Sequence, residues 1–356
     1  MDEISQDPKL SFGFPRRRWP DVAVAAALIA AAALTVMTSQ RSQPAAPAAG
    51  RPGPAAAPAL PPSTVTTQIP LPSGQPGRMT IPGSTARASD WSASQIAAVD
   101  LAARRVTRTR QAGDPKDKPV SMTSGAGTLW VLDLSGPLLQ IDPASGAITR
   151  HLPVRGLSAD GAYGDGFIWV ITKEPNAGGG QDYLSKAGPS RHVTGKAAPI
   201  PAPELACAGF PRPQGTWIGC AGVDRITLID RRSLKPTQSL RVGSGRYTPH
   251  IVPGPPAVWV LTPSGLARAD PATGRVTTII RTGYSPSAMS APDLIMDSAG
   301  RLWITGALLT VVGPGAPTAK PVARTPDLIS AAADGSAVWV DTGSTLVRVT
   351  GFLPGG

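Results

Sequence analysis

From about residue 63 onward, hydrophobic residues occur in short runs separated by Gly, Pro, Asp or Ser. The stretch Gly125 to Val154, GAGTLWVLDLSGPLLQIDPASGAITRHLPV, shows the pattern: the runs TLWVLD, LLQIDP and AITRHL alternate with turn residues. Short apolar runs bounded by turn residues are typical of β-strands. Together with the preceding PVSMTS, the stretch predicts four short strands in succession.

The same pattern recurs along the chain, with a Trp in the second run of each copy. From Trp130 onward the copies read TLWVLD, FIWVIT, GTWIGC, AVWVLT, RLWITG and AVWVDT, and turns such as IDPASG and ADPATG follow the Trp. A unit of about 40 residues with four short strands is typical of a β-propeller blade. Counting Trp91, seven units predict an all-β, seven-bladed β-propeller, and six blades are the alternative if Trp91 is coincidental.

The last unit contains only three predicted strands, in LISAAAD, AVWVDT and TLVRVT. Upstream of the first unit, the segment STVTTQIPLP alternates like a lone strand. Closing the ring would remove two exposed sheet edges, which an open array would leave free to pair. We therefore expect a propeller over residues 63–356, with residues 64–70 completing the last blade.

The N-terminal part of the chain has a different pattern. An apolar run over residues 22–37, VAVAAALIAAAALTVM, follows the basic segment PRRRWPD. This predicts a transmembrane anchor over residues 21–39, or alternatively a signal segment, with residues 1–20 in the cytoplasm by the positive-inside rule. The Pro- and Ala-rich residues 40–62 predict a disordered stalk. The expected localisation is the cell membrane, single pass, with the propeller outside.

Composition and charge support the all-β prediction and narrow the choice of partners. The 356 residues include 39 Gly and 40 Pro but Glu only at positions 3, 174 and 204, so charged helix formers are scarce. The net charge of +11 is spread along the chain, and no nucleic-acid-binding motif accompanies it. We expect the membrane and an unknown protein or small-molecule ligand as partners, and no nucleic acid. The basic segment ARRVTRTR, residues 103–110, is expected on an outer strand, as a charged edge or a binding patch.

The motifs LWV, IWV, AVWV and LWIT, followed by IDPASG and ADPATG, resemble those of YVTN-type and NHL-type propellers, and more narrowly the virginiamycin B lyase-like group. The resemblance covers about residues 64 to 352 and implies the propeller architecture. The lyase of that group uses a His and acidic residues with Mg²⁺. Only His250, in TPHIVPGPPAVWV, resembles that pattern, whereas His151 and His192 fall on predicted outer strands. The favoured function is a ligand- or protein-binding scaffold, and the alternative is a metal-dependent lyase or hydrolase.

Candidate ligand-binding residues open the predicted inner strands, which converge on the propeller axis. In PELACA, PHIVPG, PDLIMD and PDLISA, the residue after Pro is Glu204, His250, Asp293 or Asp327. Three carboxylates and an imidazole suit Mg²⁺, Ca²⁺ or a cationic ligand, whereas the alternative is that such residues cap turns. Loops leading to the same central mouth carry further candidates: Arg246, Tyr247 and Tyr284.

The two cysteines of the chain, Cys207 and Cys220, flank the turn PRPQG on adjacent predicted strands. Equal counting from the turn places them opposite each other, at a separation that suits a disulfide. Export from the cytoplasm would favour oxidation. The sequence predicts a disulfide, and two separate buried thiols are the alternative.

Overall fold

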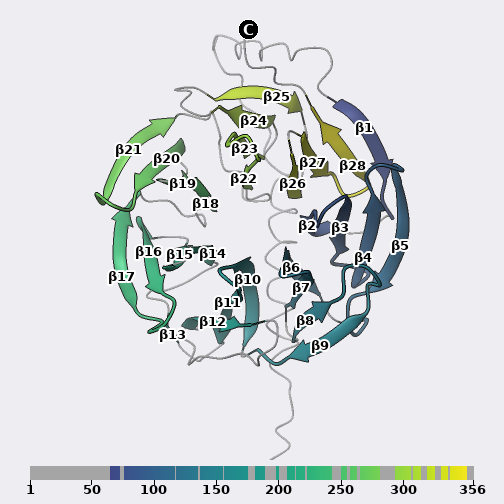
Figure 1. Ribbon diagram of the computed structural model, residues 1–356, viewed down its shortest axis with the longest axis horizontal. Helices are drawn as coiled ribbons and strands as arrows, with labels where there is room; N and C mark the ends of the chain where they lie inside the picture. The colour runs from purple at the N-terminus through teal and green to yellow at the C-terminus, as the bar shows by residue number, and fades with distance from the viewer. Residues whose placement is uncertain are drawn as a thin grey trace, which may run out of the picture. The chain divides into compact units, whose positions relative to one another are not determined.

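The computed structural model describes residues 65–72, 76–116, 118–134, 137–154, 156–174, 181–188, 198–199, 207–212, 214–220, 223–242, 250–254, 257–262, 265–280, 293–305, 308–313, 319–324, 330–335 and 337–350. Over these ranges the regular structure is entirely β-strand (Figure 1). They contain no helix long and apolar enough to cross a membrane. The predicted cytoplasmic tail, anchor and stalk, residues 1–62, lie outside the described ranges.

The strands form seven four-stranded antiparallel sheets, numbered here by the order in which their inner strands occur in the chain. The first contains β2 (Pro76–Thr80), β3 (Thr85–Asp90), β4 (Gln95–Asp100) and β5 (Arg105–Gln111). The second contains β6 (Pro119–Gly125), β7 (Thr128–Asp133), β8 (Leu138–Ile141) and β9 (Ile148–Leu152). The third contains β10 (Leu157–Gly164), β11 (Phe167–Glu174), β12 (Gln181–Ala187) and β13 (Ala198–Pro199).

The remaining sheets repeat this order. The fourth contains β14 (Cys207–Arg212), β15 (Gly215–Cys220), β16 (Arg225–Asp230) and β17 (Pro236–Arg241). The fifth contains β18 (His250–Gly254), β19 (Ala257–Thr262), β20 (Gly265–Asp270) and β21 (Arg275–Ile280). The sixth contains β22 (Leu294–Met296), β23 (Leu302–Ile304), β24 (Leu308–Val312) and β25 (Lys320–Arg324). The seventh contains β26 (Ser330–Asp334), β27 (Ala337–Asp341), β28 (Thr345–Val349) and β1 (Val65–Pro70).

The seven sheets close into a ring. Each inner strand contacts the next, from β2 through β6, β10, β14, β18 and β22 to β26, and β26 contacts β2 again (Figure 1). Strand β1 pairs with β28, with Gln68 opposite Val347, and so supplies the outer strand of the seventh sheet from the N-terminal side. The seven-bladed propeller predicted from the repeats is therefore confirmed. The predicted completion of the last blade by the N-terminal segment is confirmed as well, because β1 is its outer strand.

Six sheets carry a Trp in their second strand. The Trp is the third residue of that strand in five of these sheets and the second residue of β23 in the sixth sheet. Five of these rings are nearly inaccessible to solvent: Trp130, Trp169, Trp217, Trp303 and Trp339 each expose 2% or less. Trp339, for example, packs on Met79, Ala86 and Val99 of the first sheet. Burying an aromatic ring of this size removes a large apolar area from water, so the Trp positions hold adjacent sheets together.

The first sheet departs from this pattern. Trp91 was expected on its second strand, but this was wrong: Trp91 follows the end of β3, lies in a turn and is 37% exposed. The third position of β3 is instead Arg87, which is 8% exposed. The ring nonetheless has seven sheets, because β2 to β5 pair through their backbones without requiring the Trp.

Candidate functional site

The inner strands surround a central cavity of about 190 Å³. Its polar lining comes from five different sheets: Arg78 from β2, Ser121 from β6, Asp160 from β10, His250 from β18, and Asp293, which directly precedes β22. Inner strands can contribute side chains to one site because they are the elements nearest the axis (Figure 1). The closed ring thus brings together residues that are more than 200 positions apart in sequence, such as Arg78 and Asp293.

Asp293 is the best-paired carboxylate in this cavity. Its Oδ2 atom lies 3.1 Å from Nη1 of Arg78, and its Oδ1 atom lies 3.4 Å from Nδ1 of His250. The backbone N–H of Leu294 also donates to Oδ1, at 3.1 Å. Burial opposes ionisation, but the charge of Arg78 and the contact with His250 outweigh it and lower the pKa of Asp293 to about 2. Asp293 is therefore an anion at neutral pH, with both oxygens engaged.

Asp160 presents a second carboxylate to the cavity. It accepts a hydrogen bond from Ser121 Oγ at 3.2 Å and from the backbone N–H of Gly209 at 3.4 Å. The charges of Asp293 and Asp160 both raise the pKa of Arg78, against the opposing effect of burial. No cation of the described residues lies within ion-pair distance of Asp160, so its charge remains available to a ligand.

β-Bulges help to turn these side chains toward the axis. The pairing register shifts between Pro119 and Ser121 in β6 and between Ser158 and Asp160 in β10, and β2 carries a similar shift that includes Arg78. A bulge inserts one extra residue, bends the strand and redirects the side chain that follows. The irregular backbone of the first three inner strands is thus located at the cavity-lining residues.

Two of the seven predicted ligand-binding residues fall within the described ranges, and the structure brings these two together: His250 and Asp293. The other predicted candidates lie outside the described residues: Glu204, Asp327, Arg246, Tyr247 and Tyr284. Sequence reasoning missed Arg78, Ser121 and Asp160, because it searched for a polar residue after Pro.

A constant spacing from the Trp position would have found the missed residues. Arg78, Ser121, Asp160 and His250 each lie nine residues before the third position of the next strand, which is Arg87, Trp130, Trp169 and Trp259 respectively. The pairing explains this spacing, because Ser121, Asp160 and His250 each lie opposite the residue two positions after the Trp. Antiparallel hairpins with turns of equal length thus place one residue of each inner strand in the same layer.

The described part of the site does not form a metal centre. No group of three or more His, Cys, Asp or Glu side chains with metal-binding geometry occurs among the described residues. Arg78 also places a positive charge 3.1 Å from Asp293, which disfavours a second cation there. The predicted divalent cation, Mg²⁺ or Ca²⁺, would need Glu204 and Asp327, and stays a prediction.

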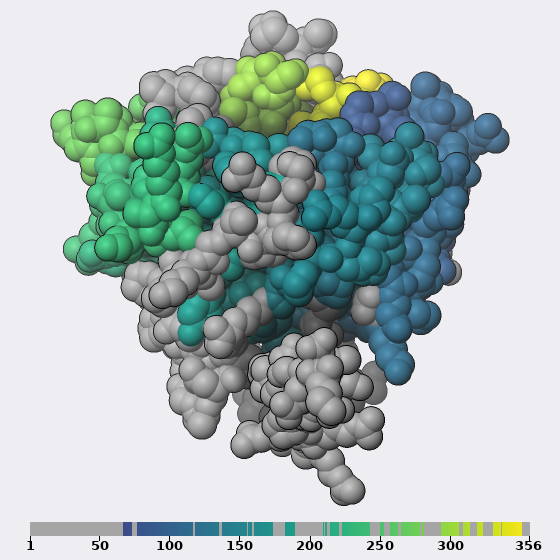
Figure 2. Space-filling model, turned by 60° about the horizontal axis from the view of Figure 1, so that its bottom comes forward, coloured from purple at the N-terminus to yellow at the C-terminus, as the bar shows by residue number. Residues whose placement is uncertain are grey.

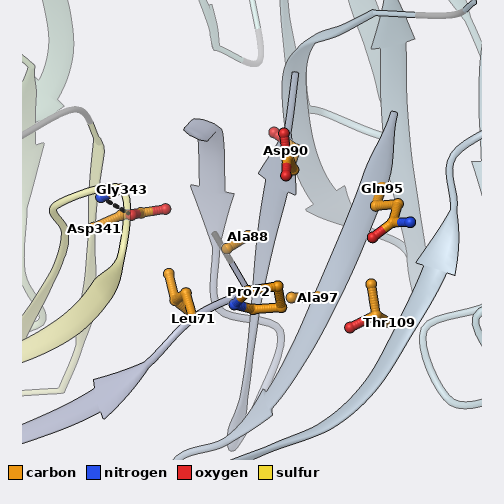
Figure 3. A pocket seen from close by; sticks show the side chains of 10 residues that line it. Leu71, Pro72, Ala88, Asp90, Gln95, Ala97, Thr109, Asp341 and Gly343 are labelled. Carbon is orange, nitrogen blue, oxygen red and sulfur yellow. Dashed lines mark hydrogen bonds between the residues drawn. The ribbon is translucent and has the colours of Figure 1, made fainter. Parts of the chain in front are cut away.

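A second pocket lies between the seventh and first sheets, at the closure of the ring (Figure 3). Asp341, at the end of β27, is 1% exposed and directs its side chain into this pocket. Its Oδ1 atom accepts a hydrogen bond from the N–H of Gly343 at 2.7 Å, and its Oδ2 atom has no hydrogen-bond partner in the described structure. Burial, together with the charge of Asp90, raises the pKa of Asp341 to about 6.

The register of the fourth sheet bears on the two cysteines. Strands β14 and β15 pair with Cys207 directly opposite Cys220. Cys220 is 5% exposed, and the side chain of Cys207 lies outside the described part of the structure. The backbone arrangement is the one that a cross-strand disulfide needs, and the bond itself stays a prediction.

Comparison with known proteins supports the architecture. No family model and no curated protein sequence matches the chain. Among solved structures, virginiamycin B lyase from Staphylococcus aureus is 16% identical, with a TM-score of 0.64 over 80% of this chain and 99% of that one. The hydrazine synthase of Kuenenia stuttgartiensis gives 14% identity and a TM-score of 0.63 over 79% and 97%.

A third similar structure is a chain of a mitotic checkpoint complex, with 12% identity and a TM-score of 0.66 over 88% of this chain and 98% of that one. These three proteins carry unrelated names, and identities this low show a shared fold alone. The architectural resemblance to the virginiamycin B lyase-like group is confirmed. The activity must be argued from the site.

Proposed function

We propose that this protein is a membrane-anchored, extracytoplasmic β-propeller that binds a ligand or a protein segment at its central cavity. The observation that carries the proposal is the polar layer of the inner strands, in which Arg78, Asp160, His250 and Asp293 line one cavity of about 190 Å³. Concave sites with a few convergent polar groups are the usual location of ligand binding. The ring supplies a rigid frame, and the predicted stalk would hold it away from the membrane.

The charges suggest the chemistry of the ligand. Arg78 and Asp293 neutralise each other at 3.1 Å, so Asp160 carries the remaining charge of the described lining. A ligand with an amine or another cationic donor would gain a charge-assisted hydrogen bond to Asp160, and its acceptor groups would face Arg78 and Ser121. The predicted occupant is a polar molecule or peptide segment with at least one positive charge.

This proposal is tested by purifying the full-length chain from its native membrane in mild detergent and identifying the bound molecules and proteins by mass spectrometry. We expect Asp160→Asn and Arg78→Gln to lose the bound species by at least about tenfold, because each removes a charged hydrogen-bonding group. Matched controls are Asp114→Asn and Arg275→Gln, which change exposed residues away from the cavity. Recovery of the same species from all four variants would contradict the proposal.

A second candidate function is a hydrolase or lyase acting in the same cavity. It is favoured by one observation: Nδ1 of His250 lies 3.4 Å from Oδ1 of Asp293, and a His oriented by a carboxylate is a common general base. The described residues do not fit the metal that a metal-dependent enzyme requires. If a bound molecule is converted to a product, His250→Gln should stop conversion while leaving binding within about threefold. Equal conversion by His250→Gln would exclude this role.

Two further parts of the proposal concern the N-terminal segment and the cysteines. For the anchor, the full-length chain should stay with the membrane pellet after carbonate extraction, and deletion of residues 21–39 should release it.

The proposed disulfide is supported by the pairing of strands β14 and β15, which places Cys207 opposite Cys220. The oxidised chain should take up no iodoacetamide when unfolded, and two equivalents after reduction. Uptake of two equivalents without reduction would show separate thiols.

A further inference from the structure

Arg87 occupies the place that Trp holds in the other six sheets. It is 8% exposed, and it donates a hydrogen bond from Nη2 to the carbonyl oxygen of Pro143, in the turn between β8 and β9 of the second sheet. Its Nε atom is buried and has no hydrogen-bond partner in the described structure. A buried N–H group of a charged side chain without a partner is costly, and binding an acceptor there would offset that cost.

Two further arginines lie beside Arg87 on outer strand β5. Arg108 donates to the carbonyl oxygens of Ala144 and Ser145, and the side chain of Arg110 lies next to Gly146. The three arginines line a shallow surface pocket between the first and second sheets, with a water-accessible volume of about 10 Å³. In Figure 2 the blue surface of the first sheet adjoins the blue-green surface of the second.

Positive charge prevails in this pocket. Its lining contains one carboxylate, Asp142, whose Oδ1 atom is engaged within its own turn by the N–H groups of Ala144 and Ser145, at 2.8 and 2.6 Å, and by the Ser145 hydroxyl at 3.0 Å. Burial and the repulsion from Arg108 lower the pKa of Arg87. The charge of Asp142 acts in the opposite direction and raises the pKa of Arg87. Arg87, Arg108 and Arg110 form no ion pair within 4.0 Å in the described structure, so three cations share this one more distant carboxylate.

We propose that Arg87, Arg108 and Arg110 form a binding site for an oxyanion of the phosphate class, separate from the central cavity. Guanidinium groups bind phosphate oxygens in a bidentate manner, and three of them around one pocket can contact a tetrahedral anion from several sides. Gln111 also lines the pocket; its amide nitrogen donates to the carbonyl oxygen of Ala93 at 3.3 Å and carries a second N–H as a further donor. Free phosphate and the phosphate of an anionic lipid headgroup present the same oxygens, so both belong to this ligand class.

The test measures the thermal unfolding of the full-length chain in neutral nanodiscs of phosphatidylcholine. Inorganic phosphate or pyrophosphate is the probe, and sodium chloride at equal ionic strength is the reference. We expect a rise of about 3 °C in Tm at tenfold the dissociation constant. A second arm adds phosphatidylglycerol to the nanodiscs without free phosphate. A rise in that arm identifies the headgroup as a source, and a rise with soluble probes alone identifies free phosphate.

Two variants and one control make the result specific. Arg87→Trp restores the residue of the other six sheets, so it should fold and lose the response to phosphate. The double variant Arg108→Gln/Arg110→Gln changes exposed residues only and should weaken binding by at least about tenfold. Arg275→Gln, an exposed arginine on outer strand β21, should respond like the unmodified chain. The proposal is overturned if phosphate raises the Tm no more than sodium chloride does, or if all variants respond equally.

Discussion

Asp293 and Asp341 are both largely withdrawn from solvent, yet their pKa values move in opposite directions. Asp293 faces the central cavity, contacts Arg78 and His250, and has a pKa lowered to about 2. Asp341 faces the closure between the seventh and first sheets, accepts one hydrogen bond from Gly343, and has a pKa raised to about 6. Burial disfavours the charge at both positions, so the partner decides the sign of the shift.

The difference follows from where each residue lies in its sheet. Asp293 directly precedes inner strand β22, so the ring brings it to Arg78 of the first sheet. Asp341 ends the second strand β27 and points into a pocket bordered by the small residues Ala88 and Ala97, with Asp90 as a further acid. Among the described residues, the central cavity therefore contains a carboxylate paired with a cation, Asp293, whereas the pocket at the closure of the ring contains a carboxylate without such a cation, Asp341.

The largest expected effect comes from removing the partner of Asp293. Arg78→Met should destabilise the chain by about 3 kcal/mol at pH 7, at the low end for a broken buried pair because the Arg78 side chain is 35% exposed. Urea unfolding at constant pH measures this. The control Arg225→Met removes an exposed pair with Asp224 and should cost less than about 1 kcal/mol. Equal losses would mean that the cavity pair behaves like a surface pair.

The second effect is a pH dependence caused by Asp293. Because its pKa is lower in the folded than in the unfolded chain, its stabilisation is fully present above about pH 4 and is lost as the pH falls toward 2. The loss should be about 2 kcal/mol. Urea unfolding between pH 5 and 2.5 should show a shallower decline for Asp293→Asn than for the unmodified chain. Parallel declines would contradict a lowered pKa.

The third effect has the opposite sign. The pKa of Asp341 is higher in the folded than in the unfolded chain. The free energy of unfolding therefore falls as the pH rises from about 4 through 6, and the loss is complete above that range. Asp341→Asn should therefore stabilise the chain by about 1–2 kcal/mol at pH 7.5 and have little effect at pH 4. The gain stays below the full penalty because the new amide also needs a partner. Destabilisation of the same size at both pH values would count against an uncompensated charge.

The repeat spacing predicted most of the fold, because one side chain, Trp, fills the same wedge between sheets in six of the seven copies. The first sheet was harder to recognise: Arg87 holds the Trp position there, and the nearby Trp91 lies in a turn. Backbone pairing fixes a sheet even where the repeated side chain is replaced, so a search for Trp alone assigns the wrong residue to this copy.

The candidate site was predicted in part. His250 and Asp293 stand out in sequence because each follows Pro at a strand start, and the structure places them 3.4 Å apart. Arg78 and Asp160 follow no Pro, and the spacing from the Trp position is the feature that would have identified them. The uncompensated charge of Asp341 depends on the closure of the ring, which places it beside residues some 250 positions away, so no local pattern could predict it.

The most direct test of the contrast between cavity and closure is a titration of the side-chain carboxyl ¹³C signals of the full-length chain, with assignments from Asp293→Asn and Asp341→Asn. The partners described above predict a midpoint near pH 2 for Asp293 and near pH 6 for Asp341. Midpoints for both residues near the ordinary aspartate value of about 3.9 would contradict the pairing of Asp293 and the isolation of Asp341.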